Sequence, residues 1–190
     1  MNESDNLHAS SSKRSAFARR ATIAPLFALL AISTAAWGQG HHAASDSLVD
    51  EVRRAIRQFA DVDAAGAAGY GPFLGCVNGP QEGAMGIHYV NGDLVGDGKL
   101  NLQTPEALMY EPKNGRLELV GVEYIVLAEQ WDAENPAPPT LKGQVFHYVG
   151  SPNRYGIPAF YELHVWAAKD NPNGAFADWN PKVSCLDYRP

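Results

Sequence analysis

Apolar residues at helical spacing mark the first regular element of this 190-residue chain, in residues 47–64. The sequence there is SLVDEVRRAIRQFADVDA, and its apolar positions recur at steps of three or four residues: Leu48, Val52, Ile56, Phe59 and Val62. This period places them along one face of an α-helix. Asp46 or Ser47 is suited to cap its N-terminus. We therefore predict an amphipathic helix over 47–64 with one buried stripe.

Beyond this helix the hydrophobic period shortens to two. The segments concerned are rich in β-branched and aromatic residues and are separated by Gly, Pro and Asn: AMGIHYV (84–90), EALMYEP (106–112), GRLELVGVEYIVLAE (115–129), GQVFHYVG (143–150) and PAFYELHVWA (158–167). Such segments are typical of strands. Their short connections favour antiparallel pairing. The pattern predicts a single α+β domain over 47–190, with the N-terminal helix packed on a curved antiparallel sheet of about five strands.

Polar residues interrupt the apolar faces of three predicted strands. Glu123 stands at the centre of the longest strand, and His88 points away from the side of Ile87 in its own strand. Glu162 and His164 share the face of Phe160 and Trp166. An ionised carboxylate buried without a partner costs several kcal/mol. These groups must therefore be paired, protonated or bound to a metal.

Three hypotheses account for such residues. In the first, His88, Glu123, Glu162 and His164 converge to hold a divalent metal such as zinc or iron, with His147 as a substitute ligand. In the second, two His–Glu pairs stabilise the sheet of a non-catalytic structural or binding domain, without an ion. In the third, one glutamate is a general base oriented by a histidine. The sequence leaves open whether the protein is an enzyme and what its substrate would be.

The first 38 residues have the pattern of a secretory signal peptide. Lys13, Arg14, Arg19 and Arg20 precede an apolar, alanine-rich run that ends near Gly38. That run is interrupted by Pro25 and is shorter than the roughly 20 apolar residues that span a bilayer. We predict a signal peptide over 1–38 and a flexible mature N-terminus over 39–46, with a retained anchor as the alternative. The expected location is periplasmic or secreted, with no membrane partner after cleavage.

Charge and cysteine content agree with export. Without residues 1–38 the chain keeps 11 basic and 19 acidic residues, a formal charge of −8. It has no cluster of Lys and Arg, which argues against a nucleic-acid partner. Its two cysteines, Cys76 and Cys185, form an even pair, which in an exported protein predicts a disulfide.

Several segments together resemble a group of uncharacterised exported bacterial proteins with no assigned activity. They are GAMGIHYVN, PEALMYEP, LVGVEYIV, GSPNRYG and YELHVWAAKDNPNGAFADWNP, spread over residues 70–185. The resemblance implies an exported single-domain protein and implies no cofactor, substrate or residue role. The function predicted from the sequence is thus a small exported domain with a His/Glu pocket, whose small-molecule or protein partner is not specified.

Overall fold

The computed structural model describes residues 47–190, so the predicted signal peptide (1–38) and mature N-terminus (39–46) lie outside the described residues. Residues 47–56 are helical and continue into a 3-10 turn, η1 (Arg57–Ala60). A further helix, α2 (Val62–Ala67), follows directly. Within residues 47–190, no helix has the length and apolar character needed to cross a membrane.

The apolar stripe of this helical segment is buried as expected. Leu48, Val52, Ile56 and Phe59 are all buried in the main core. The prediction of an unbroken helix to residue 64 is wrong, because Asp61 adopts an extended conformation with φ −91° and ψ 115°. The Asp61 side chain accepts a hydrogen bond from the Asp63 backbone N–H and so caps α2. Asp61 therefore divides the helical segment in two, while the predicted apolar positions remain on the buried face.

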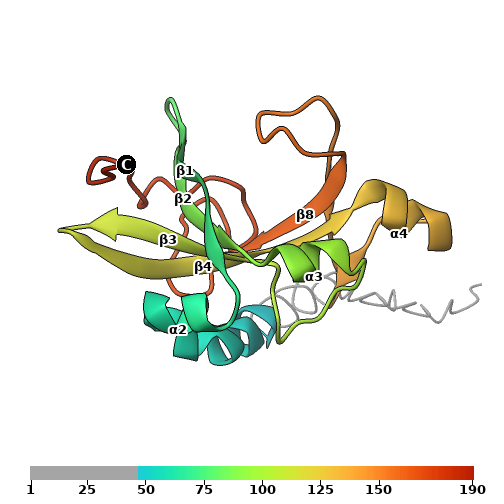
Figure 1. Ribbon diagram of the computed structural model, residues 1–190, viewed down its shortest axis with the longest axis horizontal. Helices are drawn as coiled ribbons and strands as arrows, with labels where there is room; N and C mark the ends of the chain where they lie inside the picture. The colour runs from blue at the N-terminus through green and yellow to red at the C-terminus, as the bar shows by residue number, and fades with distance from the viewer. Residues whose placement is uncertain (1–46) are drawn as a thin grey trace, which may run out of the picture. The chain divides into compact units, whose positions relative to one another are not determined.

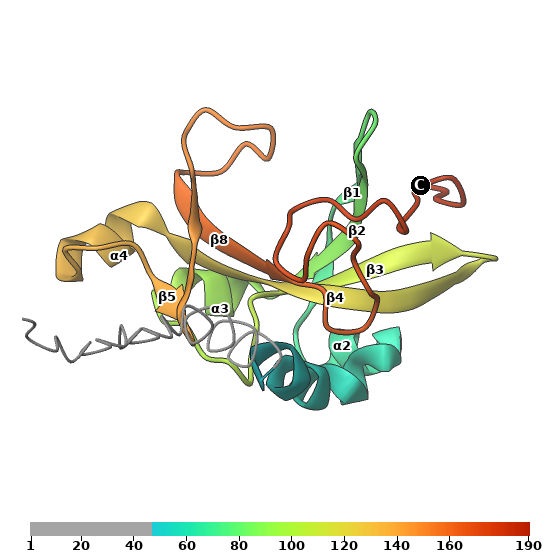
Figure 2. The same ribbon diagram turned by 180° about the vertical axis from the view of Figure 1, so that it is seen from behind.

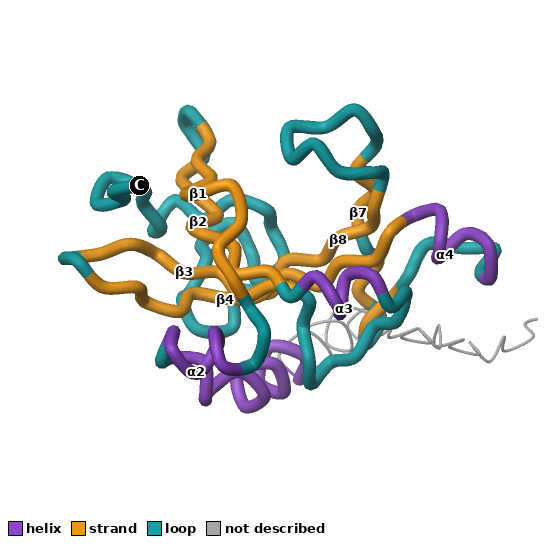
Figure 3. The backbone as a smooth tube through the Cα atoms, in the orientation of Figure 1, coloured by secondary structure: helices purple, strands orange, loops and turns teal. Residues whose placement is uncertain are grey.

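The sheet is antiparallel throughout and strongly curled (Figures 1 and 3). Its spatial order is β1-β2-β3-β4-β8-β7. The strands are β1 (Gly71–Gly79), β2 (Gly83–Val90), β3 (Ala107–Lys113), β4 (Arg116–Leu127), β7 (His147–Val149) and β8 (Phe160–Val165). The remaining elements are α3 (Gly92–Gly96), α4 (Ala128–Glu134) and a small hairpin of β5 (Thr140–Leu141) and β6 (Gln144–Val145). The α+β class is confirmed for the described residues, and the sheet has six strands where about five were predicted.

The additional strand is β1, which lacks an ordinary strand signal. Its sequence, GPFLGCVNG, contains three glycines and a proline, residues that are depleted in strands. Its register with β2 shifts between Phe73 and Cys76, so that Leu74 and Gly75 have no partner in the ladder. Such a bulge bends a strand locally. Pairing with β2 therefore makes β1 a strand that its own sequence does not predict.

The two faces of the sheet have different coverings. One face packs on helical residues 47–67, and the Tyr110 hydroxyl of β3 donates a hydrogen bond of 2.6 Å to the Phe59 carbonyl there. In Figure 1 these helices lie below the sheet, while the β1–β2 hairpin and the loop before β8 rise above it. The C-terminal segment, residues 166–190, begins against the helical segment, where the Ala167 carbonyl accepts a hydrogen bond of 2.7 Å from Arg53 Nε. Its last residues lie above the sheet, and its course is seen best from behind (Figure 2).

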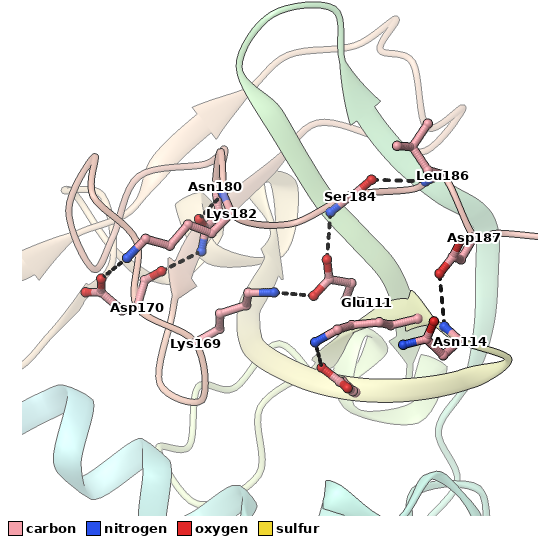
Figure 4. A network of polar contacts seen from close by, with 11 residues as sticks. Glu111, Asn114, Lys169, Asp170, Asn180, Lys182, Ser184, Leu186 and Asp187 are labelled. Atoms are coloured by element: carbon pink, nitrogen blue, oxygen red, sulfur yellow. Dashed lines mark hydrogen bonds and ion pairs between the residues drawn. The ribbon is translucent and has the colours of Figure 1, made fainter.

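Several contacts fasten the C-terminal segment to the sheet. The predicted Cys76–Cys185 disulfide is confirmed and joins this segment to β1. Glu111 of β3 is buried, pairs with Lys169, and accepts a hydrogen bond of 3.0 Å from the Ser184 backbone N–H (Figure 4). These contacts fix the course of a segment that has little regular secondary structure.

Candidate metal centre

The strand register brings three of the predicted polar residues together. Glu123 of β4 lies directly opposite His164 of β8. On its other side Glu123 faces Ala107 of β3, and His88 of β2 is paired with Met109, two residues further along β3. The His88 Nε2 and Glu123 Oε2 atoms are 3.3 Å apart, and the His88 and His164 ring centroids are 6.1 Å apart. Residues from three strands thus meet on the face that lies away from the helices.

These three side chains form a compact ligand set. Each of His88, Glu123 and His164 is buried and offers one ligand atom, and the three atoms all lie within 4.8 Å of one another. Two imidazoles and one carboxylate are the donor set of catalytic zinc sites and of non-haem iron sites. The arrangement is therefore suited chemically to a divalent transition metal.

Glu162 and Asp178 extend the cluster beyond His164. Glu162, His164 and Asp178 also place one ligand atom each within 4.8 Å of one another. The His164 Nδ1 and Asp178 Oδ1 atoms are 3.6 Å apart. The predicted substitute ligand His147 is largely exposed, and its Nδ1 lies 3.4 Å from the same Asp178 oxygen. All four predicted residues belong to one cluster, whereas His147 lies at its outer edge.

Asp178 is the member of the cluster that the sequence analysis missed. It lies in the C-terminal segment, in the turn-rich stretch FADWNP, where no periodicity marks a buried side. The loop is held in place because the Trp166 backbone N–H donates to the Ala175 carbonyl at 2.9 Å and Asn180 pairs with Ala84 of β2. The nearest signal was an acidic residue between Phe176 and Trp179, which alone does not predict a site.

Several buried polar atoms of the cluster have no hydrogen-bond partner among residues 47–190. They are Glu162 Oε2, both ring nitrogens of His164, and Asp178 Oδ1. Buried side-chain polar atoms in proteins are hydrogen-bonded in the large majority of cases. Four such atoms around one histidine therefore call for a specific explanation.

The electrostatics of the cluster are dominated by burial and by mutual interaction. Burial, aided by the charge of His164, lowers the pKa of His88 to about 3. Burial alone would also lower the pKa of His164, but the negative charges of Glu123, Asp178 and Glu162 outweigh it and raise that pKa to about 9. The cluster thus favours the neutral imidazole at His88 and the positively charged imidazole at His164.

The two carboxyl groups that flank His164 are shifted in opposite directions. Burial raises the pKa of Glu123 well above its ordinary value, and repulsion from Glu162 adds to this effect while His164 opposes it. The polar contact with His164 lowers the pKa of Asp178. Carboxylates so placed around one point favour any positive charge located between them.

A cavity of about 510 Å³ opens beside the cluster. His88 and Glu123 belong to its lining, together with residues of β1, α3, β4 and the loop before β8. His164 is not part of that lining, so it stands behind the cavity wall. An ion held by all three side chains would therefore lie at the inner wall, where a further coordination position can face the cavity.

Comparison of the chain with family models, with curated proteins and with solved structures finds no match.

Proposed function

We propose that this protein is an exported domain that binds a divalent transition-metal ion, zinc or iron, through His88, Glu123 and His164. Glu162 is the candidate fourth ligand. The observation that carries the proposal is that both ring nitrogens of the buried His164 lack a hydrogen-bond partner among residues 47–190. A metal ion on one nitrogen and a proton shared with Asp178 on the other would satisfy both.

The spacing of the ligand atoms supports this assignment. Zinc and iron hold nitrogen and oxygen ligands at about 2.0–2.2 Å, so two atoms on one ion can be at most about 4.4 Å apart. The 3.3 Å separation between His88 Nε2 and Glu123 Oε2 already falls within this limit. The whole set lies within 4.8 Å, so small side-chain rotations would bring all three atoms onto one ion.

Asp178 supports the same proposal from outside the ligand set. Histidines that bind a metal commonly direct their second nitrogen at a carboxylate, which fixes the orientation of the ring and increases its basicity. The 3.6 Å approach of Asp178 Oδ1 to His164 Nδ1 has this arrangement. It leaves His164 Nε2 as the nitrogen that would bind the ion.

Two alternatives from the sequence analysis compete with the metal site. A purely structural His–Glu network is favoured by the contact between His88 and Glu123, but it leaves Glu162 Oε2 and both His164 nitrogens unsatisfied. Metal-free base catalysis is favoured by the raised pKa of Glu123 at the cavity wall. It likewise gives no role to the unsatisfied atoms, and the metal site accounts for them best.

Export is supported by the disulfide between Cys76 and Cys185, since such bonds persist in oxidising compartments. A periplasmic or secreted location, reached through the signal peptide predicted over 1–38, is part of the proposal.

The deciding experiment is elemental analysis by mass spectrometry of protein produced from the full chain without a histidine tag. We expect one zinc or iron ion per chain in the wild type and loss of that ion in His164→Ala and Glu123→Gln. His147→Ala is the matched control, because it removes an exposed histidine at the edge of the cluster and should keep the ion. Circular dichroism checks that each variant is folded. Sub-stoichiometric metal in the wild type, unchanged in folded His164→Ala, would refute the proposal.

A further inference from the structure

The cavity beside the metal centre has walls that are almost entirely apolar. Its volume of about 510 Å³ is within the range of sites that bind small organic molecules. Side chains from β1, β2, α3, β4, the loop before β8 and β8 supply the apolar surface: Phe73, Val90, Val95, Ile125, Ile157 and Phe160. A ligand that filled this space would need an apolar body.

The polar content of the lining is confined to a few groups. His88 and Glu123 supply the ionisable groups next to the proposed ion, and Tyr155 adds a phenol whose hydroxyl lies 3.8 Å from the Met85 sulfur. Among residues 47–190, no Lys or Arg lines the cavity. An anionic or oxygen-donor group on a ligand therefore has one favourable place, which is the metal ion held by His88 and Glu123.

Leu74 adds an unusual apolar surface to this cavity. It lies in the β1 bulge, lines the cavity, and is 59% exposed. Its φ of 59° is in the left-handed region, which is unfavourable for a bulky side chain. Asparagine tolerates this conformation better. The leucine thus extends the apolar wall toward solvent at a position where the backbone favours a smaller polar residue.

We infer that the cavity binds a small molecule with an apolar body and a single oxygen-donor head group, the head on the metal ion and the body against the apolar walls. This inference rests on the proposed metal site. It identifies the substrate or ligand class as hydrophobic and excludes highly charged or polyhydroxylated molecules, because His88, Glu123 and Tyr155 are the few polar side chains that the walls offer them.

The test uses two probes that share a metal-binding head and differ in their apolar body, namely acetohydroxamate and octanohydroxamate. Isothermal titration of the zinc-loaded wild type measures both affinities. We expect octanohydroxamate to bind at least about tenfold more tightly, since each buried methylene adds to affinity. If acetohydroxamate binds and the longer chain brings no gain, the inference fails while the metal site stands. If the protein takes up neither zinc nor iron, the proposed function fails and the inference fails with it.

A matched pair of variants tests whether the affinity gained with the longer chain arises in this cavity. Leu74→Asn removes the exposed apolar side chain of the lining, whereas Val145→Asn removes a similarly exposed apolar side chain, 57% exposed, from β6 outside it. In Leu74→Asn we expect the ratio of octanohydroxamate affinity to acetohydroxamate affinity to fall by roughly threefold or more. The zinc content and the acetohydroxamate affinity should not change. Val145→Asn should retain the gain. An equal effect of the two substitutions would contradict binding in this cavity.

Discussion

Glu123 and His164 face each other across β4 and β8, two strands that are far apart in sequence and paired in register. Because side chains alternate between the faces of a strand, a slip of one residue would turn one of the two away from the other. The proposed metal centre is thus a product of strand register. The apolar residues on the opposite face, such as Tyr124 and Leu163, enforce that register by packing in the main core.

The contact between Asp178 and His164 predicts a graded effect on metal binding. Asp178→Asn removes the negative charge beside His164 Nδ1 and leaves the three ligands in place. Loss of such an outer carboxylate commonly lowers metal affinity about 10–100-fold. Competition with a chromophoric chelator measures this change.

His147→Gln serves as the comparison for that measurement. It alters the exposed neighbour of Asp178, whose Nδ1 lies 3.4 Å from the same Oδ1 atom that faces His164. We expect a change in affinity of no more than about threefold, in keeping with the small value of exposed ion pairs. Equal affinities for wild type and Asp178→Asn would show that the aspartate does not orient the ligand.

Glu162 is expected to oppose folding without metal and to favour metal binding. Its carboxylate is buried, and its repulsion raises the pKa of Glu123. In chelator, Glu162→Gln should therefore raise the free energy of unfolding by roughly 1–3 kcal/mol, because a buried carboxyl group with an unsatisfied oxygen is removed. With zinc present, the variant should lose affinity by about tenfold or more.

Urea denaturation with and without zinc measures both effects of Glu162→Gln. Glu129→Gln, on the exposed surface of α4, is the matched control and should change neither quantity appreciably. A variant that is less stable in chelator would argue instead for the structural His–Glu network.

Glu106 predicts a loss of stability as the pH rises from about 4.5 to about 8. Burial raises the pKa of this carboxyl from 4.5 to about 8, against the opposing effect of the hydrogen bond that its Oε2 accepts from the Ile125 N–H at 2.9 Å. The folded protein therefore holds the proton more tightly than the unfolded chain. The resulting stabilisation is complete below pH 4.5 and is lost as the pH rises through about 8, at about 1.4 kcal/mol per pH unit within that window.

The matching variant is Glu106→Gln, which keeps an acceptor for Ile125 and cannot ionise. Its free energy of unfolding should fall less than that of the wild type between pH 5 and pH 9 in urea titrations. Parallel pH profiles for the two proteins would show that Glu106 does not carry this dependence.

The Cys76–Cys185 disulfide spans 109 residues of sequence. Closing a loop of this length stabilises the folded state by up to roughly 4–5 kcal/mol in the chain-entropy treatment. The double variant Cys76→Ser, Cys185→Ser should lose a substantial part of that amount in urea titrations. Wild type unfolded in reducing agent should then match the double variant, and a gap between them would point to an effect of the serines themselves.

The sequence predicted those parts of the structure that depend on local patterns. The period of the helix identified the buried positions Leu48, Val52 and Ile56, and strand alternation placed Glu123, Glu162 and His164 on the face that they occupy. Convergence with His88 was expected because each was a polar residue in an otherwise apolar strand. A polar residue on the apolar face of a predicted strand can be recognised from the local sequence alone.

Features that depend on distant contacts were not predictable in this way. β1 is a strand because β2 pairs with it, although GPFLGCVNG has weak strand character. Asp178 approaches His164 because a loop without periodicity is fastened by Trp166 and Asn180. The cavity likewise arises where the β1 bulge, α3 and the loop before β8 meet, and none of these segments specifies it alone.

The covalent link between β1 and the C-terminal segment has a consequence for when the site can form. Cys76 belongs to the strand that supplies one wall of the cavity, and Cys185 to the segment that presents Asp178 to His164. The bond thus connects the two parts that enclose the proposed metal centre. If the proposal holds, the site is completed only after the thiols are oxidised, and the ion is then acquired in the compartment in which the bond is made.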